Sequence, residues 1–269
     1  EWKRLEEQEK GKVDFQTMLM GMCDKKNFLD IIENFIVFDD SHGETVKIIA
    51  RNHQYLGVNR AFSAVQQREV REGKLGVFWH TQGSGKSYSM GFLSRKVHRL
   101  LPGNFTFLII TDREELDNQI IQTFAGIGAV KDNTTQAASG DALENLLKQN
   151  HRYVFTLIHK FNKPGKIYSP RPDIIVISDE AHRTQYGKLA ENMRYSLPNA
   201  SFIGFTGTPL MESESDQRTR EVFGDYVSVY DFQRAVEDNA TVPLYYDNRG
   251  EKISFREQEE ECQLEITET

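Results

Sequence analysis

The stretch WHTQGSGKS, residues 79–87, has the residue types and spacing of a phosphate-binding loop. The standard pattern is G-x-x-x-x-G-K-[ST], and here His80 stands where the first glycine belongs. Gly83 and Gly85 still allow the backbone to turn with positive φ and to approach a phosphate closely. Because the missing glycine removes only the outermost hinge, the stretch predicts a nucleotide site. A plain turn between a strand and a helix is the alternative.

The other groups of this loop are those that a nucleotide needs. Successive N–H groups of Gly83, Ser84, Gly85 and Lys86 can form a concave anion site at the N-terminus of a helix. The Lys86 ammonium is predicted to contact the β and γ phosphates, and the Ser87 hydroxyl is predicted to bind Mg²⁺.

Two adjacent carboxylates, Asp179 and Glu180, directly follow the apolar run 173–178. Acids at the end of a buried strand are costly unless a cation faces them. Asp179 is suited to hold Mg²⁺ through water, and Glu180 is suited to orient and deprotonate an attacking water. An acidic helix N-cap is the alternative, but the D-E-A-H sequence after a strand, following the glycine-rich loop, disfavours it.

A third group, Phe205-Thr206-Gly207-Thr208-Pro209, follows another apolar run. Small hydroxyl residues with a glycine and a proline make a tight turn that can bond across to a neighbouring loop. His182 is its predicted partner, and a simple turn is the alternative.

Short apolar runs alternate with helical segments from residue 75 onward, and these elements must position the three motifs. We predict strands at 75–79, 105–111, 153–158, 173–178 and 201–206, and helices at about 87–101, 113–125, 139–149 and 186–196. Runs that are apolar on both faces are typical of a parallel sheet covered by helices on both sides. The pattern predicts a doubly wound α/β fold, in which ligands bind at the carboxyl ends of the strands.

The two ends of the chain differ from this pattern. Residues 1–12 are charged and lack periodicity, which predicts a linker or a fraying end. Residues 14–36 carry apolar side chains at helical spacing, which predicts two helices or one broken helix packed in the core. These side chains are Phe15, Met18, Leu19, Met22, Phe28, Leu29, Ile32, Phe35 and Ile36. Residues 251–269, with seven acids and two bases, form an acidic tail.

The composition is that of an ordinary globular chain, with 38% hydrophobic and 27% charged residues. The acidic tail accounts for −5 of the formal charge of −7, so the rest of the chain lacks a basic nucleic-acid footprint. Any nucleic-acid contact must come from a local groove or from other parts of the protein. Two distant cysteines and the lack of a signal peptide or an apolar run of about 18 residues predict a cytoplasmic protein without membrane contact.

Taken in order, GSGKS, DEAH and TGTP resemble the first motor domain of superfamily 2 helicases and translocases. Longer segments resemble, more narrowly, the motor and restriction (R) subunit of type I restriction enzymes, in which a residue other than glycine is usual at the position of His80. The resemblance covers about 28–249, and its last segment is the most telling because general helicases lack it. The segments are NFIVFD (34–39), KIIARNHQYLGVNRA (47–61), WHTQGSGKS (79–87), TDREELDNQ (111–119), SDEAHRTQYG (178–187), GFTGTP (204–209) and FGDYVSVYDFQRAVEDNATVPLYYDNR (223–249).

The resemblance implies a RecA-like P-loop NTPase domain that uses ATP and Mg²⁺ to drive translocation along duplex DNA. It implies that residues 1–40 follow a nuclease domain as a linker and helical segment. Residues 41–250 would form the first motor domain, and residues 251–269 would lead toward a second one. Cleavage would belong to the nuclease domain, and target recognition to methylation and specificity subunits. Since the second motor domain supplies an arginine finger, we expect little ATP turnover from this chain alone.

The resemblance also assigns nucleotide contacts. Gln54 resembles the glutamine that reads the adenine edge, which an amide can do because it donates and accepts at once. Arg51 would support it, and a polar helix-entry residue is the alternative for Gln54. The implied ATP contacts are Arg51, Gln54, Thr81, Gly83, Ser84, Gly85, Lys86, Ser87, Thr206 and Thr208. The implied catalytic residues are Lys86, Asp179, Glu180 and His182, with Ser87 and Asp179 on the metal.

Candidate nucleic-acid contacts follow two other predicted strands. Thr111, Asp112 and Arg113 match the motif that usually faces the nucleic-acid backbone. His159 and Lys160 end the next predicted strand at a similar site. Surface charge is the alternative for both groups.

Two other functions stay open. One is an RNA helicase of the DEAH type, although that class usually carries S-A-T where this chain has Thr206-Gly207-Thr208. The other is a nucleotide-gated binding module without turnover, and the presence of both Lys86 and Glu180 argues against it.

Overall fold

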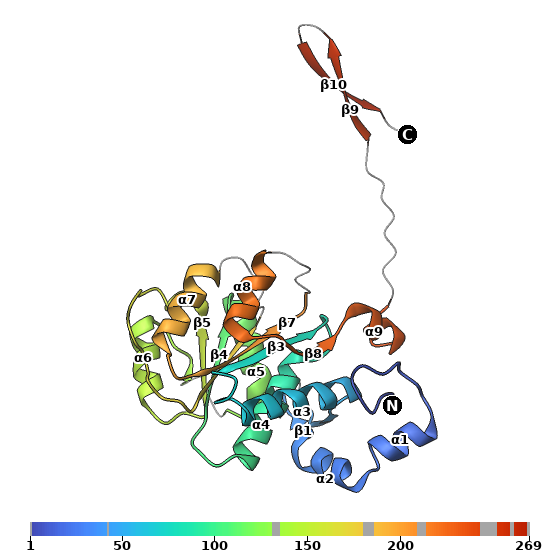
Figure 1. The fold of residues 1–269 in the computed structure, drawn as a ribbon, viewed down its shortest axis with the longest axis vertical. Helices are drawn as coiled ribbons and strands as arrows, with labels where there is room; N and C mark the ends of the chain where they lie inside the picture. Colours follow the sequence, from blue (N-terminus) through green and yellow to red (C-terminus); the bar gives the residue numbers. More distant parts are fainter. Residues whose placement is uncertain are drawn as a thin grey trace.

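Six parallel strands form one sheet at the centre of the computed structural model (Figure 1). The structure describes residues 2–41, 43–130, 135–179, 186–208, 214–242, 252–258 and 261–267. Within these ranges the strand order is β5-β4-β6-β7-β3-β8, and each neighbouring pair is parallel. The strands are β3 (Lys74–His80), β4 (Thr106–Thr111), β5 (Tyr153–Leu157), β6 (Ile174–Asp179), β7 (Ser201–Thr206) and β8 (Tyr226–Tyr230).

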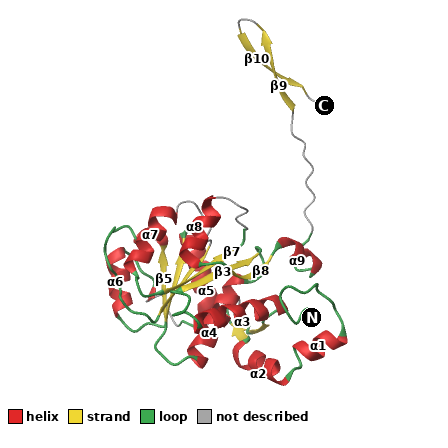
Figure 2. Cartoon of the chain, in the orientation of Figure 1, coloured by secondary structure: helices red, strands yellow, loops and turns green. Residues whose placement is uncertain are grey.

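Helices cover both faces of the sheet (Figure 2). On β4, Phe107 and Ile109 join the core under one helical layer, whereas Leu108 and Ile110 join the core under the other. Both faces of the strands are therefore buried, which is why they are continuous apolar runs. The first layer holds α3 (Asn52–Gln66), α4 (Lys86–Leu100) and α5 (Glu114–Gly126), and the second holds α6 (Gly140–Lys148), α7 (Tyr186–Ser196) and α8 (Glu214–Phe223).

The predicted α/β fold is confirmed, and the five predicted strands and four predicted helices end within one residue of the observed bounds. The sequence analysis did not predict β8 or α3. The run of β8 is short and has Ser228 at its centre, and α3 opens on the polar residues Asn52, His53 and Gln54. All four of these polar side chains are buried, so hydrophobic periodicity could not mark either element.

Two helices, α1 (Phe15–Gly21) and α2 (Lys25–Asn34), confirm the prediction for residues 14–36 but not the predicted burial. Ile31 and Phe35 reach the core, where α2 packs toward α4 and β1. The predicted core side chains that lie at the surface instead are Phe15, Leu19, Phe28, Leu29 and Ile32.

Residues 2–7, which we call the N-terminal strap, pack against the sheet domain and do not form the predicted free linker. Trp2, Arg4 and Glu7 are 6%, 4% and 7% exposed. Arg4 pairs with Asp238 just after α9 (Phe232–Glu237), 2.8 Å away. The buried charges of the strap, on Arg4 and Glu7, are used in ion pairs, and a sequence cannot distinguish such pairs from a solvated charge run.

Two small antiparallel sheets complete the described residues. One joins β1 (Ile36–Asp39) to β2 (Val46–Ile49), and the other joins β9 (Lys252–Gln258) to β10 (Glu261–Thr267) inside the predicted acidic tail. Across the described residues, each helix is too short or too polar to cross a membrane. The division into 1–40, 41–250 and 251–269 stays a prediction.

Candidate nucleotide site

The carboxyl ends of β3, β7 and β6 lie side by side in the sheet. The backbone register pairs Asp179 at the end of β6 with Phe205 of β7, and Phe205 with Phe78 of β3. Two strand spacings of about 4.8 Å therefore separate the acid from the strand that leads into the glycine-rich loop. The fold brings the two motifs to one edge of the sheet, with β7 between them.

The loop between β3 and α4 has the backbone conformation that its glycines predict. Gly83 has a φ of +79°, and Gly85, the N-cap of α4, has a φ of +83°. Both lie in the left-handed region that favours glycine. A Cβ atom on Gly83 would meet nothing within 4 Å, so the loop faces open space there. A Cβ atom on Gly85 would lie 2.8 Å from Nε2 of Gln54, so this glycine also admits a neighbouring side chain.

Lys86 is the first residue of α4, and its ammonium lies between β3 and β7. Nζ donates to the carbonyl of His80, 3.2 Å away. A Cβ atom on Gly207, just past the end of β7, would lie 3.0 Å from the same Nζ. The predicted phosphate lysine thus lies on the side of the loop that leads toward Asp179.

One predicted phosphate donor is used within the loop. The Ser84 N–H donates to the carbonyl of Thr81, 3.2 Å away, and Thr81 in turn donates its N–H to the carbonyl of Tyr230 at 2.9 Å. Residues 81–84 close as a turn, so the predicted set of four outward N–H groups is incomplete in this structure. Binding a phosphate with all four donors requires this turn to open.

Gln54 supports the loop with its whole amide. Its Oε1 accepts from the Arg51 N–H at 2.9 Å, and its Nε2 donates to the Gly85 carbonyl at 3.0 Å and to Ser89 Oγ at 3.4 Å. The side chain is 4% exposed. Since a peptide is planar and trans, a held Gly85 carbonyl turns the Lys86 N–H the opposite way. Both amide protons of Gln54 are used, so the predicted adenine contact, which stays a prediction, requires one of these bonds to break.

His53 holds the loop from the neighbouring position. Its Nε2 lies 3.1 Å from the Ser84 carbonyl, which can only accept, so Nε2 carries the proton. The ring is stacked on Tyr230, with ring centroids 3.9 Å apart and planes 9° apart. Burial lowers the pKa of His53 to about 4, so the imidazole is neutral at pH 7.

His80, which replaces the first glycine of the pattern, is fully buried. Its Nε2 lies 2.8 Å from Oγ of Ser228, and its ring centroid lies 3.9 Å from that of Phe78. Burial lowers the pKa of His80 well below its usual range, and the positive charge of Lys86 adds to this effect. A neutral side chain therefore fills the space beneath the loop while the His80 carbonyl anchors Lys86.

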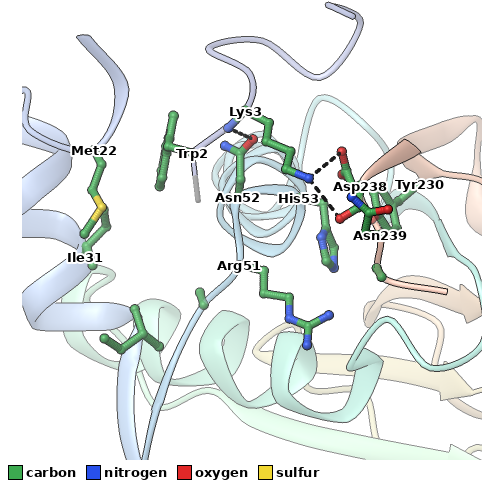
Figure 3. Close-up of a pocket in the computed structure, with 13 residues that line it drawn as sticks. Trp2, Lys3, Met22, Ile31, Arg51, Asn52, His53, Tyr230, Asp238 and Asn239 are labelled. Atoms are coloured by element: carbon green, nitrogen blue, oxygen red, sulfur yellow. Dashed lines mark hydrogen bonds and ion pairs between the residues drawn. The ribbon is translucent and has the colours of Figure 1, made fainter. Parts of the chain in front are cut away.

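A cavity of about 460 Å³ lies at the start of α3, between the strap, α2, the end of β2 and the residues that follow α9 (Figure 3). Its walls include Trp2, Lys3, Arg51, His53 and Tyr230. Arg51 is exposed, so its guanidinium is accessible to a ligand. The cavity can accept a flat ring beside a positive charge.

The other predicted nucleotide and metal residues fall into two groups. Ser87 is half-buried in the first turn of α4, and Asp179 is 9% exposed at the end of β6. Thr206 Oγ1 donates to the Thr208 carbonyl at 3.0 Å, so this turn closes on itself. Glu180 and His182 lie outside the described residues, and their roles, including the bond from His182 to this turn, stay predictions.

The predicted nucleic-acid residues follow β4 and β5, on the far side of β6 from the loop. The Arg113 side chain is 58% exposed, and His159 is exposed. Lys160 Nζ donates to the carbonyl of Ala138 at 2.8 Å. Thr111 is fully buried and its hydroxyl donates to the Arg113 carbonyl at 3.4 Å, and the nucleic-acid contact of this segment stays a prediction. Thr111 shapes the turn that presents Arg113.

Four residues of this region carry no predicted role: His53, Ser228, Tyr230 and Asp238. His53 stands inside the quoted RNHQ segment, but a lone histidine gives no signal for a loop contact. Ser228 and Tyr230 belong to β8, and without that strand no pattern could place them beside β3.

The parallel sheet, the loop with its left-handed glycines and the acid at the end of β6 define a P-loop α/β domain of the RecA-like class. Comparison with protein families makes this more specific. The model of the SWI2/SNF2 ATPase family matches residues 53–269, and the chain belongs to this family.

Known relatives carry names from restriction systems, which confirms the resemblance to R subunits. The chain is 44% identical over 276 residues to the type I restriction enzyme HindI endonuclease subunit of Haemophilus influenzae, covering 92% of this chain and 26% of that protein. It is 36% identical over 244 residues to the putative type I restriction enzyme MjaIXP endonuclease subunit of Methanocaldococcus jannaschii, covering 86% and 22%. The chain thus spans about a quarter of the length of these relatives.

The crystal structure of the UvsW helicase from bacteriophage T4 is similar in fold. Its TM-score is 0.53 at 16% identity, and the match covers 81% of this chain and 72% of that chain. At this identity the likeness concerns the fold alone, and it agrees with the predicted RecA-like class.

Proposed function

We propose that this chain is the first motor domain of the R subunit of a type I restriction enzyme. It binds and hydrolyses ATP with Mg²⁺ and so drives translocation along duplex DNA. One observation carries the proposal: Lys86 Nζ lies against Gly207, at the end of the strand that separates the loop from Asp179. From these positions an ammonium and a carboxylate can face the same metal-bound triphosphate.

The proposal gives each step of the reaction to a residue of the three motifs. Lys86 bonds a phosphate oxygen beside the His80 carbonyl, because an ammonium has three N–H donors and bonds a charged acceptor strongly. Ser87, and Asp179 through water, hold Mg²⁺, which when bound neutralises charge that develops on the γ phosphate. Glu180 takes the proton of the water that attacks the γ phosphorus, while the bond to the β-phosphate oxygen breaks.

The cavity beside Arg51 supports the proposed base site. Its aromatic walls and exposed guanidinium suit a purine, and Gln54 lies three residues along α3 from Arg51. In this proposal Gln54 gives up its longest bond, to Ser89 at 3.4 Å, in exchange for the adenine edge.

The exposed Arg113 and His159 support a contact with the DNA backbone. Backbone contacts carry little sequence information, so target recognition belongs to the methylation and specificity subunits of a cytoplasmic complex. Cleavage belongs to a nuclease domain.

Two substitutions in the intact subunit test the proposal. We expect Lys86→Ala to weaken ATP binding by about tenfold or more, because a charge-assisted contact is lost. We expect Glu180→Gln to leave binding unchanged and to lower kcat by about 10²-fold or more. DNA-stimulated ATP turnover and translocation that survive both changes contradict the proposal. Stronger stimulation by RNA than by duplex DNA favours an RNA helicase instead.

A further inference from the structure

We propose that the N-terminal strap positions the phosphate loop through two chains of contacts, one ending on Lys86 and the other on Ser84. The inference deepens the proposed function and rests on it. Glu7 and Arg4, where the two chains begin, act on the loop only through the side chains between them, so both are positioning residues.

The first chain runs from Glu7 to Lys86. Oε1 of the buried Glu7 accepts from the Ser228 hydroxyl and, at 3.1 Å, from the N–H of Val229. Because the Ser228 proton goes to Glu7, the Ser228 oxygen accepts from Nε2 of His80, 2.8 Å away. The His80 carbonyl accepts in turn from Lys86 Nζ at 3.2 Å.

The Glu7 carboxylate fixes which atoms donate and which accept along this first chain of contacts. Arg60 on α3 donates to Oε2 of Glu7 at 2.7 Å and fixes the acid in place. With Glu7 as acceptor, the Ser228 hydroxyl cannot turn to donate toward the ring, so the His80 proton is held on Nε2. Without Glu7 the hydroxyl is free to rotate, and the ring loses its fixed acceptor.

The second chain runs from Arg4 to Ser84. Nη1 of Arg4 donates to both carboxylate oxygens of Asp238, at 2.9 and 2.8 Å. The Tyr230 hydroxyl donates to the same carboxylate at 3.1 Å, and its ring is stacked on His53. His53 holds the Ser84 carbonyl, so the N–H of this planar trans peptide, which belongs to the next residue, points the opposite way. That N–H is one of the predicted phosphate donors.

Asn52, the first residue of α3, attaches the strap beside both chains. Its Oδ1 accepts from the N–H groups of Lys3 and Arg4 at 3.2 and 2.9 Å, and its Nδ2 donates to the Arg4 carbonyl at 3.1 Å. Lys3 Nζ also donates to the Asp238 carbonyl at 2.9 Å (Figure 3). If the strap moves away, Glu7 and Arg4 leave together, and both chains of contacts to the loop are broken at once.

Ser228→Ala in the intact protein cuts the first chain of contacts and keeps the bonds by which Asn52 and Arg60 hold the strap. We expect the affinity for ATP with Mg²⁺ to fall about fivefold, and the KM for ATP to rise by the same factor, because His80 loses its fixed acceptor. Ser94→Ala is the matched control, since Ser94, in the middle of α4, also loses a buried hydroxyl. The Ser94 hydroxyl lies 3.1 Å from the Tyr153 hydroxyl. It should lower the unfolding temperature and leave the ATP affinity within about twofold.

Double variants test whether the two chains are separate. The affinity losses of Ser228→Ala and Tyr230→Phe should add more nearly than those of one chain of contacts, although the rings of His80 and Tyr230 lie 5.6 Å apart. Those of Ser228→Ala and Glu7→Ala should not add, because the two residues belong to one chain.

Two outcomes overturn the inference at different levels. If Ser228→Ala costs as much stability as Ser94→Ala and leaves ATP affinity unchanged, the strap has no positioning role and the proposed function stands. If Lys86→Ala also leaves ATP binding unchanged, the proposed function fails and the inference fails with it.

Discussion

Lys86 and Gly207 lie against each other beyond the carboxyl ends of the paired strands β3 and β7, since a Cβ atom at position 207 would be 3.0 Å from the lysine Nζ. The glycine-rich loop and the Thr206–Thr208 turn are far apart in the sequence, and this contact joins them. The glycine leaves room for the ammonium, so its lack of a side chain is part of the site.

Gly207→Ala should weaken the binding of ATP with Mg²⁺ about fivefold, or about 1 kcal/mol, because the added methyl displaces Nζ. Titration with a fluorescent ATP analogue measures the change. Gly91→Ala on α4 is the control, because its methyl would meet only the end of the Ile127 side chain. Equal affinities for the two variants would show that Nζ adapts without loss.

His53→Gln should flatten the pH dependence of stability. Burial lowers the pKa of His53 from 6.5 to about 4, so between these values the unfolded chain binds more protons than the folded one. Stability is then lost as pH falls from 6.5 to 4, by roughly 3 kcal/mol at most for this group. Urea unfolding between pH 7 and pH 4.5 should show a steeper loss for the wild type than for the variant. An equal loss of stability in the wild type and the variant would mean that other groups cause the acid sensitivity.

Lys96→Met should lower the free energy of unfolding by about 3 kcal/mol, because it leaves a partly buried carboxylate without its partner. Lys96 Nζ lies 2.6 Å from both oxygens of Asp30 and 2.6 Å from Oδ1 of Asn59. Its side chain is only 6% exposed. Adding Asp30→Asn should restore about 1 kcal/mol or more in urea unfolding. Strictly additive losses would mean that the two charges do not interact.

Arg113→Ala should weaken duplex DNA binding about equally for all sequences and reduce the slope of log affinity against log salt by about 0.9. Arg152→Ala is the matched control, because Arg152 is exposed just before β5, at the opposite edge of the sheet. Binding measured at several salt concentrations separates the two variants. Identical salt slopes for the two variants would indicate that the DNA contact does not lie at the carboxyl ends of β4 and β5.

The sequence was sufficient where burial is continuous. The runs of β4 and β6 are apolar at nearly every position, so their strand character and their place inside a covered sheet followed directly. The motifs at their ends could then be placed by the rule that parallel strands share one edge. Gly83 and Gly85 adopt the predicted left-handed conformation, which any other residue would adopt only with strain.

Prediction failed where polar residues are buried or apolar ones are exposed. Glu7 and Arg4 are typical of a solvated end, and only their partners on β8 and after α9 explain why they are buried. Leu29 and Ile32 share the spacing of core residues, but they lie on a face of α2 that is exposed. The bonds of the Gln54 amide to Gly85 and Ser89 could not be predicted either, because they join segments that are far apart in the sequence.

All six strands of the sheet point the same way, and this sets the layout of the rim where they end. From one side to the other, the rim carries the candidate DNA residues after β5 and β4, the acid after β6, the Gly207 turn, the phosphate loop after β3 and the cavity past β8. The proposed DNA and nucleotide sites would therefore lie along the same edge of the sheet, about 14 Å apart across the three strand spacings from β4 to β3. In the proposed function, a shift of the loop on ATP hydrolysis would reach the DNA contacts through the sheet itself, because both sets of residues follow strands of that one sheet.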